Sequence, residues 1–389
     1  MIRLLCVAGL LALLPVSGAR AQTRQENWDR CKDMKTSDLA IGACTSLIQS
    51  GTENTNDLSA LFTNRGNAYD AKGDHPRALQ DYEVALRLNP SNTNAYYNRA
   101  ATFLDAGDLD KALADAESAV RIDPRYGAAI AMRGMVARRR GQFAEAAASF
   151  EQAFSAGLGL SSPAAEAYVT SERAKNETAT KCGDADADLS IGACTSVIKE
   201  PKMVKTALAA AHNRRGIAYR AKGDYAAAGR DYSAAIALDA SVAVYFSNRS
   251  VADIYTGAWA QAEQDLRQAL VIAPKSAAAI NGQGLLARQR GDYTLALQYF
   301  RDALQLTPDN ATFISNRGIT YLLMNNYDDA SRDLNRAIAI NPKEAYALFA
   351  RGVLKRRKGD LTGGDADIAA AKGIRGDIDT EMALRNVKP

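Results

Sequence analysis

The sequence predicts an all-α fold, an α-solenoid of about eight helical hairpins in two arrays. A unit of roughly 34 residues returns along the chain, and no segment alternates apolar and polar residues with the period of a β-strand. Of the 389 residues, 47% are hydrophobic, which is enough to fill a long, thin core. Because one hairpin of this length cannot bury its apolar face alone, each hairpin must stack on its neighbours.

The first 21 residues lie outside this repeat and are predicted to be a cleaved signal peptide. Arg3 supplies a basic start, residues 4–14 form an apolar run, and Ala-Arg-Ala at 19–21 matches a cleavage site. The mature chain then begins at Gln22. A retained membrane anchor is the alternative, but the run is short for a bilayer and no second run of spanning length follows. We therefore expect an exported protein, periplasmic or secreted, that does not span a membrane.

Two cysteine-bearing segments, 22–58 and 182–208, are predicted to be helical caps that begin two related copies. Ile41–Ser46 returns as Ile191–Ser196, and each hairpin of the first copy has a counterpart 150 residues later. The sequence therefore indicates an internal duplication, with further hairpins at the end of the second copy.

Four cysteines remain in the mature chain as two equivalent pairs, Cys31 with Cys44 and Cys182 with Cys194. In an oxidising compartment this arrangement favours two structural disulfides. Each would stabilise a short hairpin by about 3 kcal/mol. Metal binding is a weaker alternative because no histidine lies near either pair, and thiol redox chemistry lacks its C-x-x-C spacing. No metal or cofactor is expected.

Each hairpin carries the same size pattern at the contact between its two helices. Gly66 of one first helix is matched by Ala78 and Tyr82 of the second helix. The small residues allow a close approach, and the tyrosine fills the space beside them. Gly73 ends the first helix and Asp74 caps the second. The equivalents of Gly66 in the other hairpins are Ala100, Gly134, Gly216, Ser250, Gly284, Gly318 and Gly352.

The pattern divides the chain into a first array of three hairpins at 59–158 and a second array of five at 209–374. Between them, residues 159–181 break the register, and Pro163 predicts a capping helix over about 163–174. Whether the arrays stack or hinge at Gly157-Leu158-Gly159 stays open. Residues 375–389 are assigned as a carboxyl-terminal tail.

This pattern resembles the tetratricopeptide repeat family over residues 59–374, although Phe62 and Arg65 replace a tryptophan and a leucine common in its first helices. The resemblance implies that the first helices line an inner surface that binds a protein or peptide. Asparagines there are suited to pair with the backbone of an extended peptide. The partner-binding residues carried over by register are Asn64, Asn67, Tyr97, Asn98, Arg138, Arg139, Asn213, Arg220, Asn248, Tyr255, Asn281, Arg288, Asn316 and Arg356.

The resemblance to family members that clamp a terminal carboxylate is only partial. Asn67 and Asn98 match two clamp asparagines, but Thr63, Ala128 and Met132 stand where basic residues belong. That specificity is not predicted.

An arginine and an aspartate sixteen residues apart recur together, as in Arg65 with Asp81. They predict a ladder of ion pairs between first and second helices, exposed and worth 0.2 to about 1 kcal/mol each. Gln283 and Tyr299 replace both members at once, and Arg133 has no matching aspartate. The other pairs are Arg99 with Asp115, Arg215 with Asp231, Arg249 with Asp265, Arg317 with Asp333, and Arg351 with Asp367. A ligand-facing role for these arginines is the alternative.

Basic clusters end three first helices, at 138–140, at 288 and 290, and at 355–358. They suit either an anionic polymer, which is our second functional hypothesis, or a solvated complement to the helix dipole. Without Arg3 and Arg20 the formal charge falls from +4 to +2, so nucleic acid is not expected as a partner.

Catalytic motifs are absent from the sequence. His212 is expected to be a core residue, because Phe62 and Tyr96 hold equivalent positions, and no nucleophile elbow or phosphate loop occurs. We therefore expect a non-enzymatic exported scaffold whose inner surface binds an unidentified protein or peptide.

Overall fold

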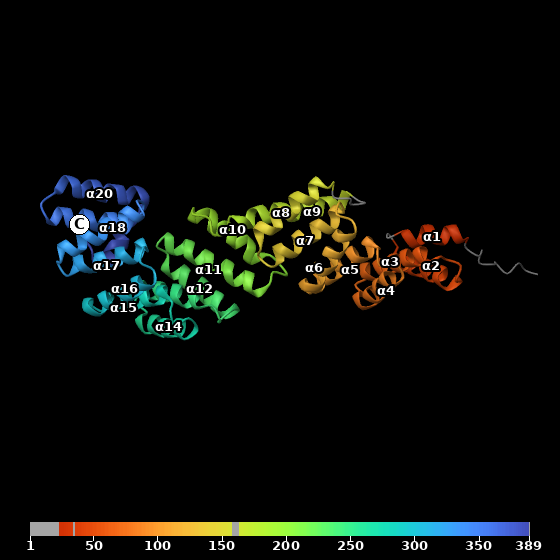
Figure 1. Cartoon of the computed structure of the whole chain (residues 1–389), viewed down its shortest axis with the longest axis horizontal. Helices are drawn as coiled ribbons and strands as arrows, with labels where there is room; N and C mark the ends of the chain where they lie inside the picture. The colour runs from red at the N-terminus through yellow and green to blue at the C-terminus, as the bar shows by residue number, and fades with distance from the viewer. Residues whose placement is uncertain (1–22, 34–35, 158–162, 389) are drawn as a thin grey trace, which may run out of the picture. The chain divides into compact units, whose positions relative to one another are not determined.

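A computed structural model describes residues 23–33, 36–157 and 163–388, and the predicted leader at 1–21 lies outside them. Throughout these ranges the regular structure is helical, and consecutive helices pack as hairpins (Figure 1). The predicted all-α solenoid of helical hairpins is therefore confirmed.

The helices occupy the following ranges. In the first copy they are α1 (Arg24–Lys32), α2 (Ser37–Ser50), α3 (Thr55–Ala71), α4 (His75–Leu88), α5 (Thr93–Ala106), α6 (Leu109–Ile122), α7 (Gly127–Arg139) and α8 (Phe143–Ser155). They continue with α9 (Pro163–Thr180), α10 (Ala187–Lys199), α11 (Lys205–Ala221), α12 (Tyr225–Leu238), α13 (Ala243–Thr256), α14 (Trp259–Ile272) and α15 (Ala277–Gln289). The last are α16 (Tyr293–Leu306), α17 (Ala311–Leu323), α18 (Tyr327–Ile340), α19 (Ala345–Arg357), α20 (Leu361–Ile374) and α21 (Ile378–Leu384).

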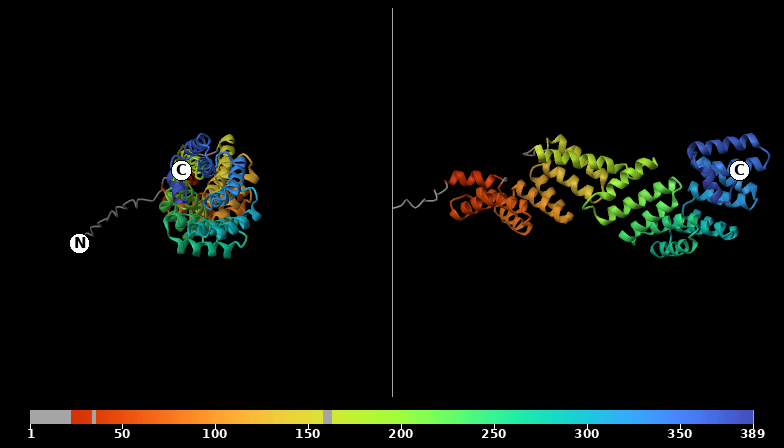
Figure 2. Two further views of the ribbon diagram at one scale, coloured as in Figure 1. Left: turned by 90° about the vertical axis from the view of Figure 1, so that its left-hand side faces the viewer. Right: turned by 180° about the vertical axis from the view of Figure 1, so that it is seen from behind.

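The contacts divide the chain into two compact units. The first contains the described residues within Met1–Arg133 and Gln152–Gly159, and the second those within Gly134–Glu151 and Leu160–Pro389. Figure 2 shows from behind how the hairpins from α11 to α20 follow one another in the second unit.

The size pattern accounts for the packing inside each hairpin. A Cβ atom added to Gly66 would lie 2.7 Å from the Tyr82 ring, and Tyr82 is 1% exposed. Gly73 has φ +75°, a left-handed conformation that glycine adopts without strain. The Asp74 side chain then accepts a hydrogen bond from the Arg77 amide and caps α4.

Helix α9 begins at Pro163 as predicted but extends to Thr180, beyond the expected end. The Asn176 side chain donates to the Phe143 carbonyl at 3.0 Å. The Val204 amide donates to the Arg139 carbonyl at 3.2 Å. Within the second unit, the third hairpin therefore stacks directly onto the second copy.

Both cysteine pairs lie at bonding distance, with sulfur atoms 2.00 Å apart for Cys31 and Cys44 and 2.12 Å apart for Cys182 and Cys194. Cys31, Cys44 and Cys194 are fully buried. The first pair joins α1 to α2, and the second joins the turn after α9 to α10.

The carboxyl-terminal segment, which the sequence suggested was a tail, contains α21. Ile378, Met382 and Val387 are fully buried in the same apolar cluster as residues of α17 and α19. The sequence did not reveal this helix because its seven residues carry too short a pattern to identify alone.

Candidate functional site

A cavity of about 250 Å³ lies in the second array among the first helices α11, α13, α15, α17 and α19. Five of the predicted partner-binding residues line it, and these are Arg220, Asn248, Tyr255, Asn281 and Asn316. The remaining polar wall includes Thr312, Tyr346 and Arg385. Side chains from five hairpins and from the carboxyl-terminal segment thus converge on one cavity.

The asparagines of the cavity are linked in pairs from one first helix to the next. Asn248 donates to the Asn213 side-chain oxygen at 2.8 Å, and Asn316 donates to that of Asn281 at 3.1 Å. An asparagine amide carries two donor hydrogens and an oxygen that accepts. Each donating asparagine uses one hydrogen in its pair, and no side-chain partner among the described residues takes its oxygen or second hydrogen.

Arg385, just beyond α21, forms the aromatic end of the cavity together with two tyrosines. Its guanidinium carbon lies 4.4 Å from the ring centroid of Tyr255 and 4.1 Å from that of Tyr346. Arg385 also donates to Glu381 at 3.0 Å, and the Tyr225 and Tyr346 hydroxyls donate to the same carboxylate. Burial raises the pKa of both tyrosines, so they stay protonated donors.

The sequence did not identify Arg385, Tyr346 or Thr312 as site residues. Thr312 and Tyr346 lie near the starts of α17 and α19, one turn away from the positions selected by register. Arg385 follows Glu381 by four residues, a spacing that favours a helix in this segment.

The predicted residues of the first array do not belong to this cavity. In the first unit, the Asn67 oxygen accepts from the Tyr82 hydroxyl at 2.7 Å, so it braces its own hairpin. The Tyr97 ring packs edge-on against Tyr126, with centroids 5.9 Å apart. Asn64 and Asn98 are half-buried on α3 and α5.

The hypothesis of arginine clusters as surface contacts for an anionic polymer is wrong for its main residues. Arg138, Arg139 and Arg288 are 2%, 7% and 1% exposed. Arg138 pairs with Glu172 and Glu200 instead of with solvent. Arg356 is half-exposed, 3.6 Å from Asp365. Packing covers Arg138, Arg139 and Arg288, which the local sequence does not show, whereas Arg290 and the cluster at 356–358 are exposed.

All six arginine–aspartate pairs form, which confirms the predicted ladder. Arg249 and Asp265, for instance, make two hydrogen bonds of 2.7 Å. The expectation that the pairs are exposed is wrong, because Asp265 is 1% exposed and the other five aspartates are also buried. In the unpaired hairpin α7–α8, Arg133 donates to Gln152 at 2.7 Å.

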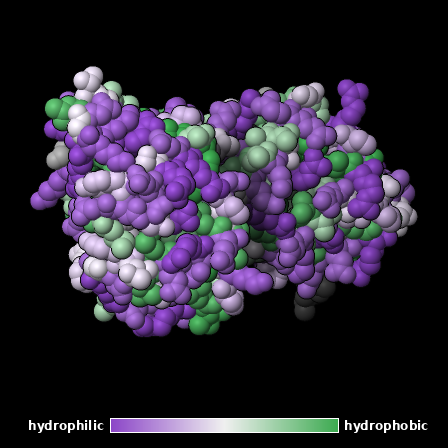
Figure 3. Space-filling view, turned by 60° about the vertical axis from the view of Figure 1, so that its left-hand side comes forward, coloured by the Kyte–Doolittle hydropathy of each residue, from purple (hydrophilic) through white to green (hydrophobic). Residues whose placement is uncertain are grey.

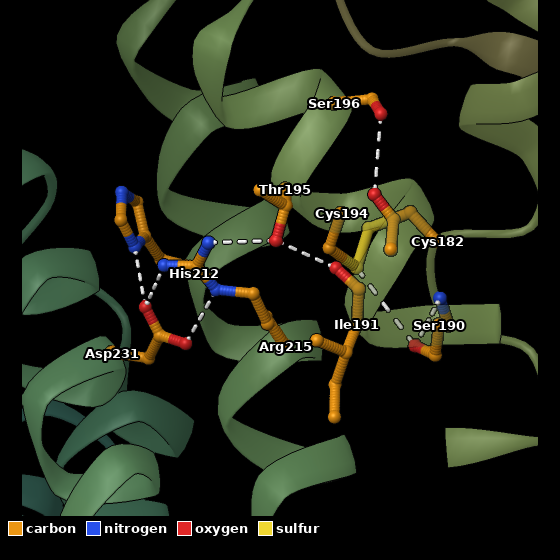
Figure 4. The surroundings of a disulfide bond; sticks show 11 residues. Cys182, Ser190, Ile191, Cys194, Thr195, Ser196, His212, Arg215 and Asp231 are labelled. Carbon is orange, nitrogen blue, oxygen red and sulfur yellow. Dashed lines mark hydrogen bonds and ion pairs between the residues drawn. A yellow bond between two sulfur atoms is a disulfide. The ribbon is translucent and has the colours of Figure 1, made fainter. Parts of the chain in front are cut away.

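The sequence predicts a core residue at His212, but its side chain is 17% exposed and joins this ladder. Its Nδ1 lies 2.8 Å from Asp231, which Arg215 also contacts (Figure 4). Burial alone would raise the pKa of Asp231. The hydrogen bonds from Arg215 and His212 outweigh this effect and hold the pKa of Asp231 below its usual value. Arg215 also reaches Thr195 of α10 at 3.0 Å, so the ladder continues to the cysteine-bearing cap.

The surface shown in Figure 3 is mostly hydrophilic, with hydrophobic residues scattered in small groups. In the described part of the chain, no helix combines the length and apolar character that crossing a membrane requires.

Three family models described as tetratricopeptide repeat match the sequence. The matched residues are 63–126 and 250–311 for one model, 287–351 for the second and 209–242 for the third, together about half of the chain. With the hairpins and their packing, these matches show that the chain belongs to the tetratricopeptide repeat family. Members of this family typically act as scaffolds that bind other proteins. No curated protein matches the sequence.

Several solved structures share the repeat. The TPR domain of P58(IPK) is 19% identical, with 84% of this chain and 98% of that chain covered and a TM-score of 0.41. A tetratricopeptide repeat protein from Parabacteroides merdae is 18% identical, with 77% and 100% covered and a TM-score of 0.40. Yeast Tom70 is 14% identical, with 85% and 91% covered and a TM-score of 0.33.

Proposed function

We propose that this protein is an exported, non-catalytic scaffold that binds a peptide segment of a partner protein in the cavity of its second array. The observation that carries the proposal is the convergence of Arg220, Asn248, Tyr255, Asn281 and Asn316 on that cavity. These residues come from successive first helices, the surface through which this family typically binds partners.

The chemistry of the cavity suits a peptide backbone. An extended peptide presents an N–H and a C=O at each residue, and these groups need partners when water is removed. The free oxygen and second hydrogen of Asn248 and Asn316 offer such partners, and Tyr255 adds an apolar ring surface. The scaffold therefore holds the backbone of its ligand, while the rest of the wall selects side chains.

Affinity capture with the mature chain, followed by mass spectrometry, tests this function. The double variant Asn248→Ala, Asn316→Ala is expected to bind the captured protein at least about tenfold more weakly, since each asparagine supplies backbone hydrogen bonds. The matched control is Gln298→Ala with Gln305→Ala, two exposed positions on the second helix α16. Equal capture by both folded double variants would contradict the proposal.

Export is a separate part of the proposal. It is supported by the basic, apolar and small-residue pattern of residues 1–21 and by the two cysteine pairs at bonding distance. Cell fractionation with amino-terminal sequencing is expected to find a mature chain that starts at Gln22 outside the cytoplasm. A full-length chain in the cytoplasm with free thiols would refute export.

A further inference from the structure

A separate cavity of about 170 Å³, which we call the cap cavity, lies between α9 and α10 at the start of the second copy. It shares no lining residue with the cavity of the second array. Its apolar wall, at most 9% exposed, is formed by Phe143, Ala179, Val197 and Met203. Lys175, Thr178 and Ser196 also line it and are exposed, so the cavity opens to solvent between the two helices.

The duplication allows the cap cavity to be compared with the same place in the first copy. Ala179 lies three residues before Cys182, and Trp28 lies three residues before Cys31. Trp28 packs against the apolar cluster around the first disulfide, and Ala179 belongs to the cluster around the second. The two copies therefore place a tryptophan and an alanine at the same point beside their disulfides.

The neighbouring residues enclose the space beside Ala179 but do not fill it. Val197 stands where the first copy has the larger Leu47. Met203 stands where it has Glu53, and Phe143 comes from the hairpin α7–α8 that stacks on the second copy. These two apolar side chains add walls around the position of the missing indole. The space that remains is the cap cavity.

The size of the cap cavity suits an aromatic ring. An enclosed apolar cavity of about 150 Å³ stays dry and binds benzene. The cap cavity, at about 170 Å³, is slightly larger and is open at one end. It can therefore hold a ring of indole size, which is the group that Trp28 supplies in the first copy.

In the first copy, polar neighbours fix the ring of Trp28. The Lys32 ammonium lies 5.3 Å from the ring centroid, a cation–π distance. Hydrogen bonds from Arg24 and from Trp28 hold the pKa of Glu53 below its usual value. A cation and a carboxylate thus accompany the apolar contacts of this indole.

The cap cavity offers the same kinds of partner to a ring. Lys175 brings a cation to the mouth, while Phe143 and Met203 bring an aromatic ring and a thioether, which both pack well against aromatic groups. Glu200 also lines the cavity, and its Oε1 accepts from Arg138 at 3.3 Å. Among the described residues no donor reaches the other oxygen of Glu200, which can accept the N–H of an indole.

We propose that the cap cavity binds one aromatic ring of the indole class from outside the chain, at the place where the first copy holds the ring of its own Trp28. A free aromatic molecule and the tryptophan side chain of a partner protein share this chemistry. The site is separate from the peptide cavity of the second array, and the inference does not depend on the function proposed above.

Fluorine NMR with 5-fluoroindole tests the site. The resonance of the probe is expected to broaden on addition of the mature chain, with saturation at one ring per chain. Unlabelled indole should displace the probe at least about fivefold more effectively than cyclohexylmethanol, an aliphatic ring compound without π electrons. Absence of binding, or equal displacement by the two compounds, would overturn the proposal.

Variants at Ala179 decide whether the probe occupies the cap cavity. Ala179→Trp copies the first copy and is expected to abolish binding, with an unchanged or higher urea midpoint because it fills a cavity. Ala179→Leu is the second, smaller filling and is expected to weaken binding at least about tenfold. The surface variant Gln298→Ala, Gln305→Ala is the control and should bind the probe as the wild type does. Unchanged binding in either folded variant at position 179 would refute the site.

The source of the ring is distinguished by a further competitor, N-acetyl-tryptophanamide, which carries a peptide group on each side of its α-carbon. Displacement of the probe by this compound as effectively as by indole identifies the side chain of a partner protein as the ligand. Displacement by indole alone identifies a free aromatic molecule. Displacement by neither, despite retention of the probe, would overturn the proposal because the retained probe would then not report an indole site.

Discussion

Replacing a helical glycine by alanine lowers or raises stability according to the space beside the glycine, and this chain contains both cases. A Cβ on Gly216 would lie 2.7 Å from the ring of Tyr232, which is fully buried, whereas a Cβ on Gly192 would meet no atom within 4 Å. Gly216→Ala is therefore expected to destabilise the protein by about 1–3 kcal/mol through overpacking.

Gly192→Ala is the matched control for that change. Because Gly192 lies inside α10 with open space beside it, alanine there is expected to stabilise by about 0.5–1 kcal/mol. Urea midpoints measured on both variants check the pair. The size-pattern argument fails if Gly216→Ala is as stable as Gly192→Ala.

The ionisation of Asp253 opposes folding near neutral pH, because the carboxyl group is partly buried and lies near another negative charge. Burial, followed by the negative charge of Asp265, raises its pKa to about 6. Since the folded value lies above the unfolded one of about 3.9, the native state binds more protons between these values and loses stability as the pH rises. Above pH 6 the full penalty is present.

Asp253→Asn is therefore expected to stabilise the protein at pH 7 by about 1 kcal/mol, after allowance for solvent around its exposed side. At pH 4 the folded wild type is protonated there and the unfolded chain is about half protonated, so the free energies of unfolding of the two proteins should differ much less than at pH 7. Urea denaturation across this range tests the sign. A stabilisation that is equal at pH 4 and pH 7 would show that charge is not its cause.

At the scale of elements, the ladder shows why hairpins of this chain keep their register. Arg249 binds Asp265 of its own hairpin and also reaches Ser233 of the preceding second helix at 3.1 Å. Arg351 does the same with Asp367 and Asn335, the latter at 3.1 Å. One guanidinium thus connects three helices. The pairing could be predicted from sequence because both members change together, whereas their burial could not, since neighbouring hairpins cover them.

Helix α21 is expected to stabilise elements at both ends of the second array. Its Ile378 and Met382 are buried against the last hairpins, while Glu381 accepts from Tyr225 at the start of α12. A chain that ends at Gly376 is expected to lose about 1.5–3 kcal/mol for each fully buried side chain removed. Amide hydrogen exchange should become faster in α19, α20 and α12.

A chain that ends at Val387 is the control for this truncation, because it keeps α21 and the buried Val387. Its exchange should match that of the full chain. If the shorter chain left the exchange of α12 unchanged, the link from α21 to the start of the array would carry no stability.

At the scale of the whole molecule, stability in a repeat protein is a sum of local terms and is not uniform. The largest apolar cluster of the described chain joins α16 to α21, whereas the cluster around Cys31 and Cys44 has few members. Hydrogen exchange is expected to be slowest in α17 and α19 and faster in α1 and α2. Equal protection of these helices would show that the chain unfolds as one cooperative unit.

The sequence alone determined the helical hairpins, the tetratricopeptide resemblance, the duplication and the arginine–aspartate ladder. The hairpins and the ladder depend on residues less than one repeat apart, such as Gly66 and Tyr82, and the duplication repeats segments of the sequence directly, so all of them are visible in the linear order. It also selected five residues of the cavity, because register along a first helix places them on one face.

Only the tertiary structure decided which of those residues meet and which are covered. Arg138 and Arg288 have the same local sequence position, yet α9 brings Glu172 to one of them, while no carboxylate of the described residues forms an ion pair with the other. Tyr225 and Glu381 are 156 residues apart and meet because the array brings its two ends within reach of α21. Such contacts arise from the stacking of many repeats, so the local pattern of any one repeat cannot contain them.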